Sequence, residues 1–372
     1  MKKSIVAVAV MGVSFPAAAE VSLYGQIRTT VSVAQTQIKG AAGTEKSHTE
    51  TKINDNTSRL GFKGSERLGG DMKAIWQVEQ RISTVGDNNG RWGSRDSFIG
   101  LEGRFGKIRA GNMNNQLNEM DTIDSWIYGN NALGLGIFTR TGSRKVSARY
   151  DTPSFAGFSA NVQYAPRDNQ NPDDKGLHEE PTRAQLDTGL NYEADKYFVK
   201  LGYNLRKNNY SDNGGKTKDA HIGRLETAYD GSKLFLGAGV QYAKGFETGN
   251  RYLARFTNDF NTYNGSSITS GSAKSESVKV VDAAVTAGYK AGNWRPKISY
   301  AHGWAAKGVN SGDVLVDKFD QIIVGSDYRF SKRTAVRGQV AHMRVGGKTR
   351  LTADTSGKVE QTAAQLGLHH RF

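Results

Sequence analysis

Apolar and polar side chains alternate along nearly the whole chain after Val21. Segments of about 8 to 14 residues carry an apolar side chain at every second position, and stretches rich in Gly, Asn, Asp and Ser separate them. Within 72–81, for example, Met72, Ala74, Trp76 and Val78 alternate with Lys73, Gln77, Glu79 and Arg81. Because successive side chains of a strand point to opposite faces, each segment predicts a strand with one apolar and one hydrated face.

The connections between these segments alternate in length. Tight turns are expected at 66–71, 104–106, 153–157, 193–195, 229–233, 291–293 and 330–333. Longer polar loops are expected near 35–53, 85–93, 112–142, 167–183, 207–219, 245–276, 305–317 and 346–356. This alternation is typical of transmembrane β-barrels, and the series joins about sixteen strands. A soluble β-sandwich or propeller is the alternative, but the strands are too long and no repeat of about 40 residues occurs.

Composition favours the same fold. The 372 residues include 44 Gly, 15 Tyr and 15 Phe but only 6 Pro, and the mean hydropathy is −0.57. After residue 20 no run of about 18 apolar residues occurs, so only a closed barrel of this sequence could cross a bilayer. The chain has no cysteine, which excludes disulfide scaffolds, thiolate zinc sites and cysteine nucleophiles.

The start of the chain reads as a secretory signal peptide over residues 1–19. Lys2 and Lys3 form a basic start, residues 5–15 are apolar, and residues 17–19 are alanines suited to cleavage. The apolar stretch is too short for a membrane anchor. We therefore expect cleavage after Ala19 and a mature barrel, residues 20–372, exported to the cell outer membrane.

The chain is strongly basic, with a net charge of +14, or +12 once Lys2 and Lys3 are removed. Its Lys and Arg side chains are spread among strands and loops rather than gathered with aromatic residues, which argues against nucleic-acid binding. A channel lined by cations, or a surface that faces polyanions, explains the charge better.

The long connection at 112–142 combines acidic and apolar side chains. Glu119, Asp121 and Asp124 lie within six residues, and apolar residues follow at Trp126, Ile127, Leu133 and Leu135. A loop surrounded by solvent has no use for such apolar residues, whereas a loop folded against an inner wall uses them as anchors. We therefore expect this segment to fold inward as a constriction loop.

The chain resembles a known family in several segments. These are 21–27 (VSLYGQI), 58–80, 94–112 and the last strand, whose outward face ends at the terminal Phe372. They resemble the trimeric general diffusion porins of Gram-negative bacteria, closest to the neisserial and β-proteobacterial branch. The resemblance implies an all-β fold: a sixteen-stranded antiparallel transmembrane β-barrel with an inward-folded third loop, assembled as a homotrimer. It also implies that Phe372 is the barrel-end signal for insertion.

The resemblance further implies a ladder of basic side chains opposite the constriction loop. Arg59 and Arg95 match the family positions directly, whereas Arg140 or Arg144 matches with a shift in spacing. Strict alternation would turn Arg95 outward, so a bulge or a position beyond the bilayer is required there. Alternation by itself puts further basic side chains on the polar face, namely Lys63, Arg81, Lys107 and Arg109, together with Arg59.

These features predict an outer-membrane channel for passive diffusion of ions and small hydrophilic solutes, with modest anion preference. The alternatives are a solute-selective anion channel and a surface adhesin with a barrel anchor, whose loops 35–53 or 245–276 would bind ligands. We interpret 245–276 as a variable exposed loop. Expected partners are two further copies of the chain, outer-membrane lipid and lipopolysaccharide, and the solutes, but no nucleic acid.

Catalysis is not expected. The seven histidines occur in no H-E-x-x-H motif, and the chain has no G-x-S-x-G motif. The segment 168–174 lacks the spacing of a calcium loop. We therefore expect no enzyme activity, no metal and no cofactor.

Overall fold

The computed structural model describes residues 20–41, 43–86, 92–127, 130–174, 176–264, 275–351 and 355–372. The predicted signal peptide, residues 1–19, lies outside these ranges.

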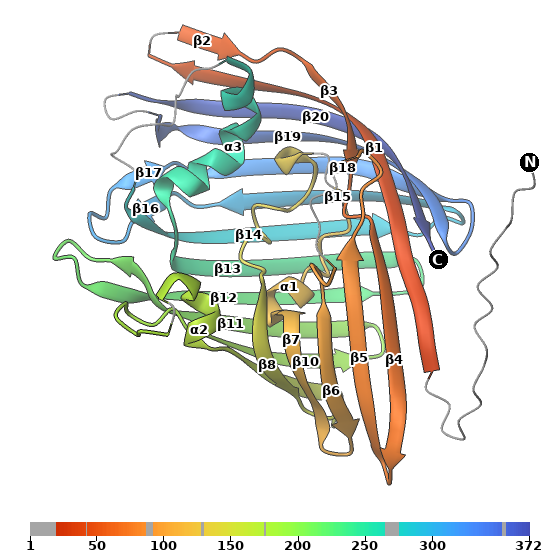
Figure 1. Ribbon diagram of the computed structural model, residues 1–372. Helices are drawn as coiled ribbons and strands as arrows, with labels where there is room; N and C mark the ends of the chain where they lie inside the picture. Colours follow the sequence, from red (N-terminus) through yellow and green to blue (C-terminus); the bar gives the residue numbers. More distant parts are fainter. Residues whose placement is uncertain are drawn as a thin grey trace, which may run out of the picture.

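The fold is a ring of antiparallel strands, each paired with the next along the chain (Figure 1). Four of the twenty described strands are short segments within the connections, and the remaining sixteen form the ring. Those sixteen are β1 (Glu20–Gly40), β4 (Arg59–Gly69), β5 (Met72–Arg81), β6 (Ser97–Gly103), β7 (Gly106–Asn114), β8 (Arg144–Asp151), β9 (Phe158–Ala165), β10 (Gln185–Ala194), β11 (Tyr197–Ser211), β12 (Thr217–Asp230), β13 (Leu234–Thr248), β14 (Ser277–Tyr289), β15 (Trp294–Gly303), β18 (Phe319–Arg329), β19 (Thr334–Arg350) and β20 (Ser356–Arg371).

The ring closes between its first and last strands. β1 pairs with β20 from Gln26 opposite Arg371 to Gly40 opposite Gly357, and its other edge pairs with β4 and β3. Red β1 and blue β20 accordingly lie side by side in Figure 1. Closure leaves no unpaired edge, which is the condition for a sheet to cross a bilayer. The predicted sixteen-stranded barrel is therefore confirmed.

The remaining elements belong to the connections. The short strands are β2 (Gly43–Lys46), β3 (Glu50–Asp55), β16 (Ala306–Gly308) and β17 (Val314–Val316). The helices are α1 (Gln116–Glu119), η1 (Asn131–Leu133), α2 (Arg167–Gln170), η2 (Pro172–Asp174) and α3 (Gly249–Asn264). Within the described ranges, no helix is both long enough and apolar enough to cross a membrane.

The two faces of the strands differ as the alternation predicts. On β20, Leu366 and Leu368 face outward and are 60% and 52% exposed. Gln365, which directly precedes Leu366, faces inward and is only 6% exposed. The outward rows are apolar, and the inward rows carry Gln, Asn, Ser, Thr and charged side chains. This arrangement suits a wall with hydrocarbon outside and water inside.

The terminal Phe372 completes the seam. Its backbone N–H and carbonyl form hydrogen bonds of 3.2 and 3.1 Å with Gly25 of β1. Its ring lies over Gly25 on the outward face, where a Cβ on residue 25 would come within 2.5 Å of it. Glycine at position 25 therefore makes room for the ring.

The loop 245–276 departs from the expectation of a variable exposed loop. Residues 249–264 form α3, in which Tyr252, Leu253 and Phe256 are at most 1% exposed. The helix starts at the end of β13 and contacts β1, β17, β20 and η1, so it extends across the mouth of the ring. The apolar residues spaced at three and four along α3 explain the inward docking, and the interpretation as an exposed loop was wrong for this part.

Candidate functional site

The connection between β7 and β8 builds the interior of the barrel. We call residues 115–143 the inner loop; residues 128 and 129 lie outside the described ranges. The side chain of Asn115 caps α1 by accepting the N–H of Asn118, and Asn130 caps η1 in the same way. The apolar side chains of the loop are almost fully buried, at Leu117, Met120, Ile123, Trp126, Ile127, Leu133 and Leu135.

Hydrogen bonds hold the inner loop against the barrel wall at several strands. Asn115 donates to Asp187 of β10 at 2.7 Å, and the Trp126 indole N–H donates to Ser299 of β15 at 2.7 Å. On β19, the Gln339 amide donates to the carbonyl of Ile127 at 3.0 Å. A segment that leaves β7, touches β10, β15 and β19, and returns to β8 must run through the ring, where Figure 1 shows α1.

Two glycines of the wall allow the inner loop to approach this closely. A Cβ at position 202 of β11 would lie 2.7 Å from the Met120 sulfur, and one at position 239 of β13 would lie 2.7 Å from the Phe138 ring. Any larger residue at Gly202 or Gly239 would push the loop into the channel.

Arg140 lies under the inner loop, away from the water of the pore. Its side chain has 0% exposure and pairs with Glu247 at 2.7 Å and Asp282 at 2.5 Å. It also lies over the Tyr252 ring of α3, 4.9 Å from the centroid. The expectation that Arg140 is a basic group of the pore surface was wrong: it joins the inner loop, α3 and the wall.

The three acidic residues of the inner loop differ in their surroundings. Glu119, 40% exposed, pairs with Arg149 at 2.7 Å, and Asp121, 37% exposed, pairs with Arg224 at 2.9 Å. Asp124 accepts backbone N–H groups of its own loop. Glu119 and Asp121 thus retain surface toward the channel.

Arg59 and Arg95 converge on one carboxylate. Glu79 of β5 is 3.4 Å from Arg59 and 2.5 Å from Arg95, and it also accepts the Tyr24 hydroxyl at 3.1 Å. Arg95 precedes β6, which begins at Ser97, so strand alternation does not govern its direction. This position outside the strand removes the conflict seen in the sequence, and no bulge is needed.

Four other basic side chains face the interior of the barrel, as strand alternation predicts. Arg81 is the cross-strand partner of Arg59, and Lys63 lies 5.6 Å from the centroid of the inward Tyr24 ring. Arg109 pairs with Asp151 at 2.7 Å, while Lys107, beside the tight turn, lies 3.8 Å from Glu102. The inward face holds all four, although Lys107 is near the rim.

Arg144 takes a different position from the expected one. It shares the side of β8 that carries the exposed Val146, and its guanidinium lies 2.9 Å from Asp96. The expectation that Arg144 belongs to the ladder inside the pore was therefore wrong. The inward arginine of this strand is Arg149, 3% exposed at the side chain, which pairs with Glu119.

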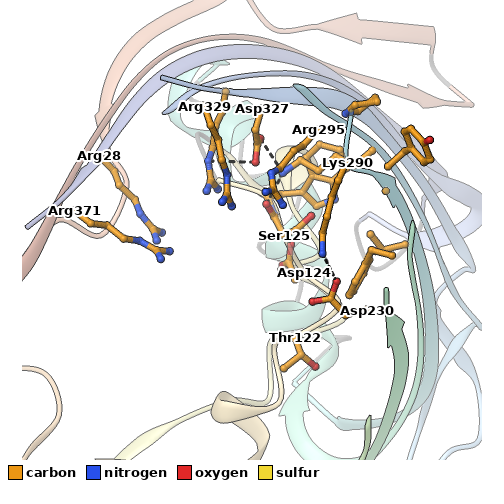
Figure 2. Close-up of a pocket in the computed structure, with 18 residues that line it drawn as sticks. Arg28, Thr122, Asp124, Ser125, Asp230, Lys290, Arg295, Asp327, Arg329 and Arg371 are labelled. Atoms are coloured by element: carbon orange, nitrogen blue, oxygen red, sulfur yellow. Dashed lines mark hydrogen bonds and ion pairs between the residues drawn. The ribbon is translucent and has the colours of Figure 1, made fainter. Parts of the chain in front are cut away.

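Sequence reasoning missed a second group of cations. Figure 2 shows Arg28 and Arg371 on one wall of a cavity of about 350 Å³, with Arg329 and Arg295 farther along it. Asp124 and Ser125 of the inner loop also line this cavity. The alternation in β1 could have identified Arg28, because it falls on the polar face with Gln26 and Thr30.

A family profile for Gram-negative porins matches residues 29–372. The chain belongs to the Gram-negative porin family. This porin is 38% identical to the major outer membrane protein P.IB of Neisseria sicca over 391 residues, and 34% identical to that of Neisseria meningitidis serogroup B over 373 residues. In both cases the match covers 100% of each chain.

Solved structures share the architecture of this porin. An anion-selective porin from Comamonas acidovorans matches with a TM-score of 0.68 and 22% identity, covering 95% of this chain and 100% of the other. OmpT of Vibrio cholerae in its trimer form matches with a TM-score of 0.61 and 15% identity, covering 95% and 100%. These two likenesses show the fold, and family membership makes this porin an outer-membrane diffusion channel.

Proposed function

We propose that this porin passes ions and small hydrophilic solutes passively, as a channel rather than an enzyme, with a modest preference for anions. The observation that carries the proposal is the closed ring whose inward rows are polar and charged while its outward rows are apolar. Water-filled barrels of this kind conduct, and the charge of their lumen biases which ions enter.

The preference for anions rests on the balance of charge at the wall. A net positive wall raises the local anion concentration over a Debye length of about 8 Å at physiological salt. Arg59 and Arg95 together carry two positive charges against the single carboxylate of Glu79. In agreement with this, a porin of the same fold from Comamonas acidovorans is described as anion-selective.

In this proposal, basic side chains of the wall and acidic side chains of the inner loop together produce an electric field across the pore. Arg59, Lys63, Arg81, Arg95 and Arg109 supply the basic side, and Lys107 adds charge at the rim. Glu119 and Asp121 supply the acidic side on the inner loop, and Asp124 adds its charge once it ionises, at alkaline pH. Polar solutes tolerate such a field, whereas apolar solutes must displace oriented water.

Planar-bilayer recording tests the proposal directly. Purified porin separating two KCl concentrations should conduct, and its reversal potential should have the sign of chloride preference. A competing solute that reduces conductance with saturation would favour the solute-selective alternative. The proposal fails if folded porin passes no ions.

The assembly proposed for this porin is a homotrimer embedded in outer-membrane lipid and lipopolysaccharide. The exposed apolar side chains of the closing strands, Leu23, Leu366 and Leu368, offer an outward surface for either contact. Chemical crosslinking in outer-membrane vesicles should give a trimer band. A monomer band alone would contradict the trimer.

Export by a cleaved signal peptide is the last part of the proposal. Residues 1–19 have the basic, apolar and small-residue regions that a signal peptidase requires. Amino-terminal sequencing of the outer-membrane protein should begin at Glu20. A chain that still begins at Met1 would contradict it.

A further inference from the structure

Two inward arginines at the seam of the barrel, Arg28 and Arg371, lie close together without a carboxylate partner among the described residues. Among the described residues, no carboxylate lies within ion-pairing distance of Arg28 or Arg371, and the charged groups acting most strongly on Arg28 are other arginines. Five other inward arginines do have an acidic partner, namely Arg59, Arg95, Arg109, Arg149 and Arg224. No neighbouring carboxylate therefore compensates the positive charge at Arg28 and Arg371.

A histidine lies between these two guanidinium groups. His369 of β20 is the cross-strand neighbour of Arg28, faces inward, and is 3% exposed. Its Nε2 accepts the Nε–H of Arg28 at 3.3 Å and the Nε–H of Arg371 at 3.4 Å. A nitrogen that accepts from a guanidinium carries no proton itself, so the imidazole is neutral and its proton is on Nδ1.

The arrangement requires an explanation because like charges repel. Two guanidinium groups remain charged at every physiological pH, and without a shared acceptor they separate or turn toward water. A carboxylate in place of His369 would hold them together but would cancel one positive charge. A neutral imidazole holds them together and keeps both charges.

We propose that His369 is a positioning residue for ion selectivity, and that Arg28 and Arg371, held by it, are a source of the anion preference. This inference rests on the proposed function. Both guanidinium groups line the same cavity as Asp124 of the inner loop, so ions that use this cavity pass close to them (Figure 2). The ladder of Arg59 and Arg95 contributes less, because Glu79 compensates it.

Substitutions of His369 by uncharged residues test whether it positions the two arginines, because they leave the net charge of the pore unchanged. His369→Leu removes the acceptor without changing the net charge, whereas His369→Gln keeps an acceptor oxygen near the place of Nε2. His370→Leu is the matched control, since His370 faces outward and its Nδ1 is hydrogen-bonded to the Thr334 hydroxyl at 2.9 Å, away from Arg28 and Arg371. Each variant is assembled as the full chain, its folding is checked by heat-modifiable migration, and its reversal potential is recorded in a KCl gradient.

His369→Leu should lower the chloride-to-potassium permeability ratio by about twofold, the scale for unit charges displaced by several ångström in screened water. His369→Gln should restore the ratio, and His370→Leu should match the wild type. In a variant that already carries Arg28→Gln and Arg371→Gln, whose ratio is low, His369→Leu should add nothing.

Two results would overturn the inference. One is a wild-type ratio in His369→Leu; the other is an equal loss in His369→Leu and His369→Gln, which would show that the ring itself and not its acceptor matters. If His369→Leu does not fold, an unchanged ratio in the Arg28→Gln, Arg371→Gln variant contradicts the inference instead. A wild-type reversal potential of zero would contradict the proposed anion preference as a whole.

Discussion

Arg140 of the inner loop lies 2.5 Å from Asp282 of β14, and both side chains are fully buried. Glu247 and Arg255 extend the pair, since Glu247 lies 2.7 Å from Arg140 and 2.8 Å from Arg255 of α3. The Tyr252 hydroxyl of α3 donates to the same Asp282 at 3.3 Å. One buried network thus joins the inner loop, α3 and the wall.

Replacing Arg140 with Met should release this network. The change leaves Glu247 and Asp282 buried with less compensation, which costs about 3–5 kcal/mol of the free energy of unfolding. We expect a lower thermal transition and noisier single-channel currents. Arg350→Met is the control, because its pair with Asp313 is exposed and such pairs contribute only about 0–1 kcal/mol. Equal effects of the two variants would contradict the role of the network.

Removing α3 should widen the entrance. If Gly249–Asn264 is replaced by a short Gly-Ser linker, the helix no longer extends from β13 toward β1 and β20. We expect a higher single-channel conductance, because the access path becomes broader. Shortening the exposed turn 212–216 is the control and should leave conductance unchanged. A conductance equal to that of the wild type after helix removal would place α3 outside the ion path.

Removing the basic side chains around Glu79 and removing Glu79 itself should shift ion selectivity in opposite directions. Arg59→Ser together with Arg95→Ser leaves Glu79 without its two cationic partners, so the reversal potential should move toward cation preference. Glu79→Gln should move it toward stronger anion preference. Reversal potentials in a KCl gradient measure both. If neither variant changes them, these residues do not face the ion path.

The pH response should depend on Asp124 of the inner loop. Burial raises the pKa of Asp124 to about 8, and the negative charge of Asp121 acts in the same direction. The hydrogen bond from the Trp126 N–H and the positive charge of Lys297 lower the pKa but do not outweigh burial. The carboxyl is therefore neutral below that value and negative above it. Anion preference should fall as the pH rises from about 6.5 to about 9, and Asp124→Asn should show a smaller fall, because burial also raises the pKa of Asp121 to about 7. Because the pKa is raised in the folded state, the contribution of Asp124 to stability falls as the pH rises from about 4 to about 8 and is constant above that value.

Phe372 should matter for assembly more than for conduction. Phe372→Ser removes the ring over Gly25 and the aromatic residue expected to act as the insertion signal. We expect less folded porin in the outer membrane, with unchanged conductance for the channels that form. Phe330→Ser, at an exposed turn residue, is the control. A normal yield of Phe372→Ser would contradict the role as a signal.

The sequence pattern correctly predicted the direction of individual side chains wherever they lie within a regular strand. Arg59, Lys63 and Arg81 face inward as the period of two requires. Arg95 precedes β6, where no regular period governs direction, so the pattern alone could not orient it. Arg144 lies within β8 and follows the period, and the resemblance rather than the alternation predicted its place in the ladder. The helix α3 was missed because its apolar residues are few and stand in a polar stretch.

The sequence by itself determined the barrel, because alternation and turn chemistry are local properties that every strand repeats. It also determined the outward face of β20 and the terminal Phe372. Only the tertiary structure decided which charges meet, since Arg140 and Asp282 are 142 positions apart, and Arg28 and His369 are 341 apart. Such pairs depend on which strands become neighbours or face each other across the ring once it closes, and no local pattern carries that information.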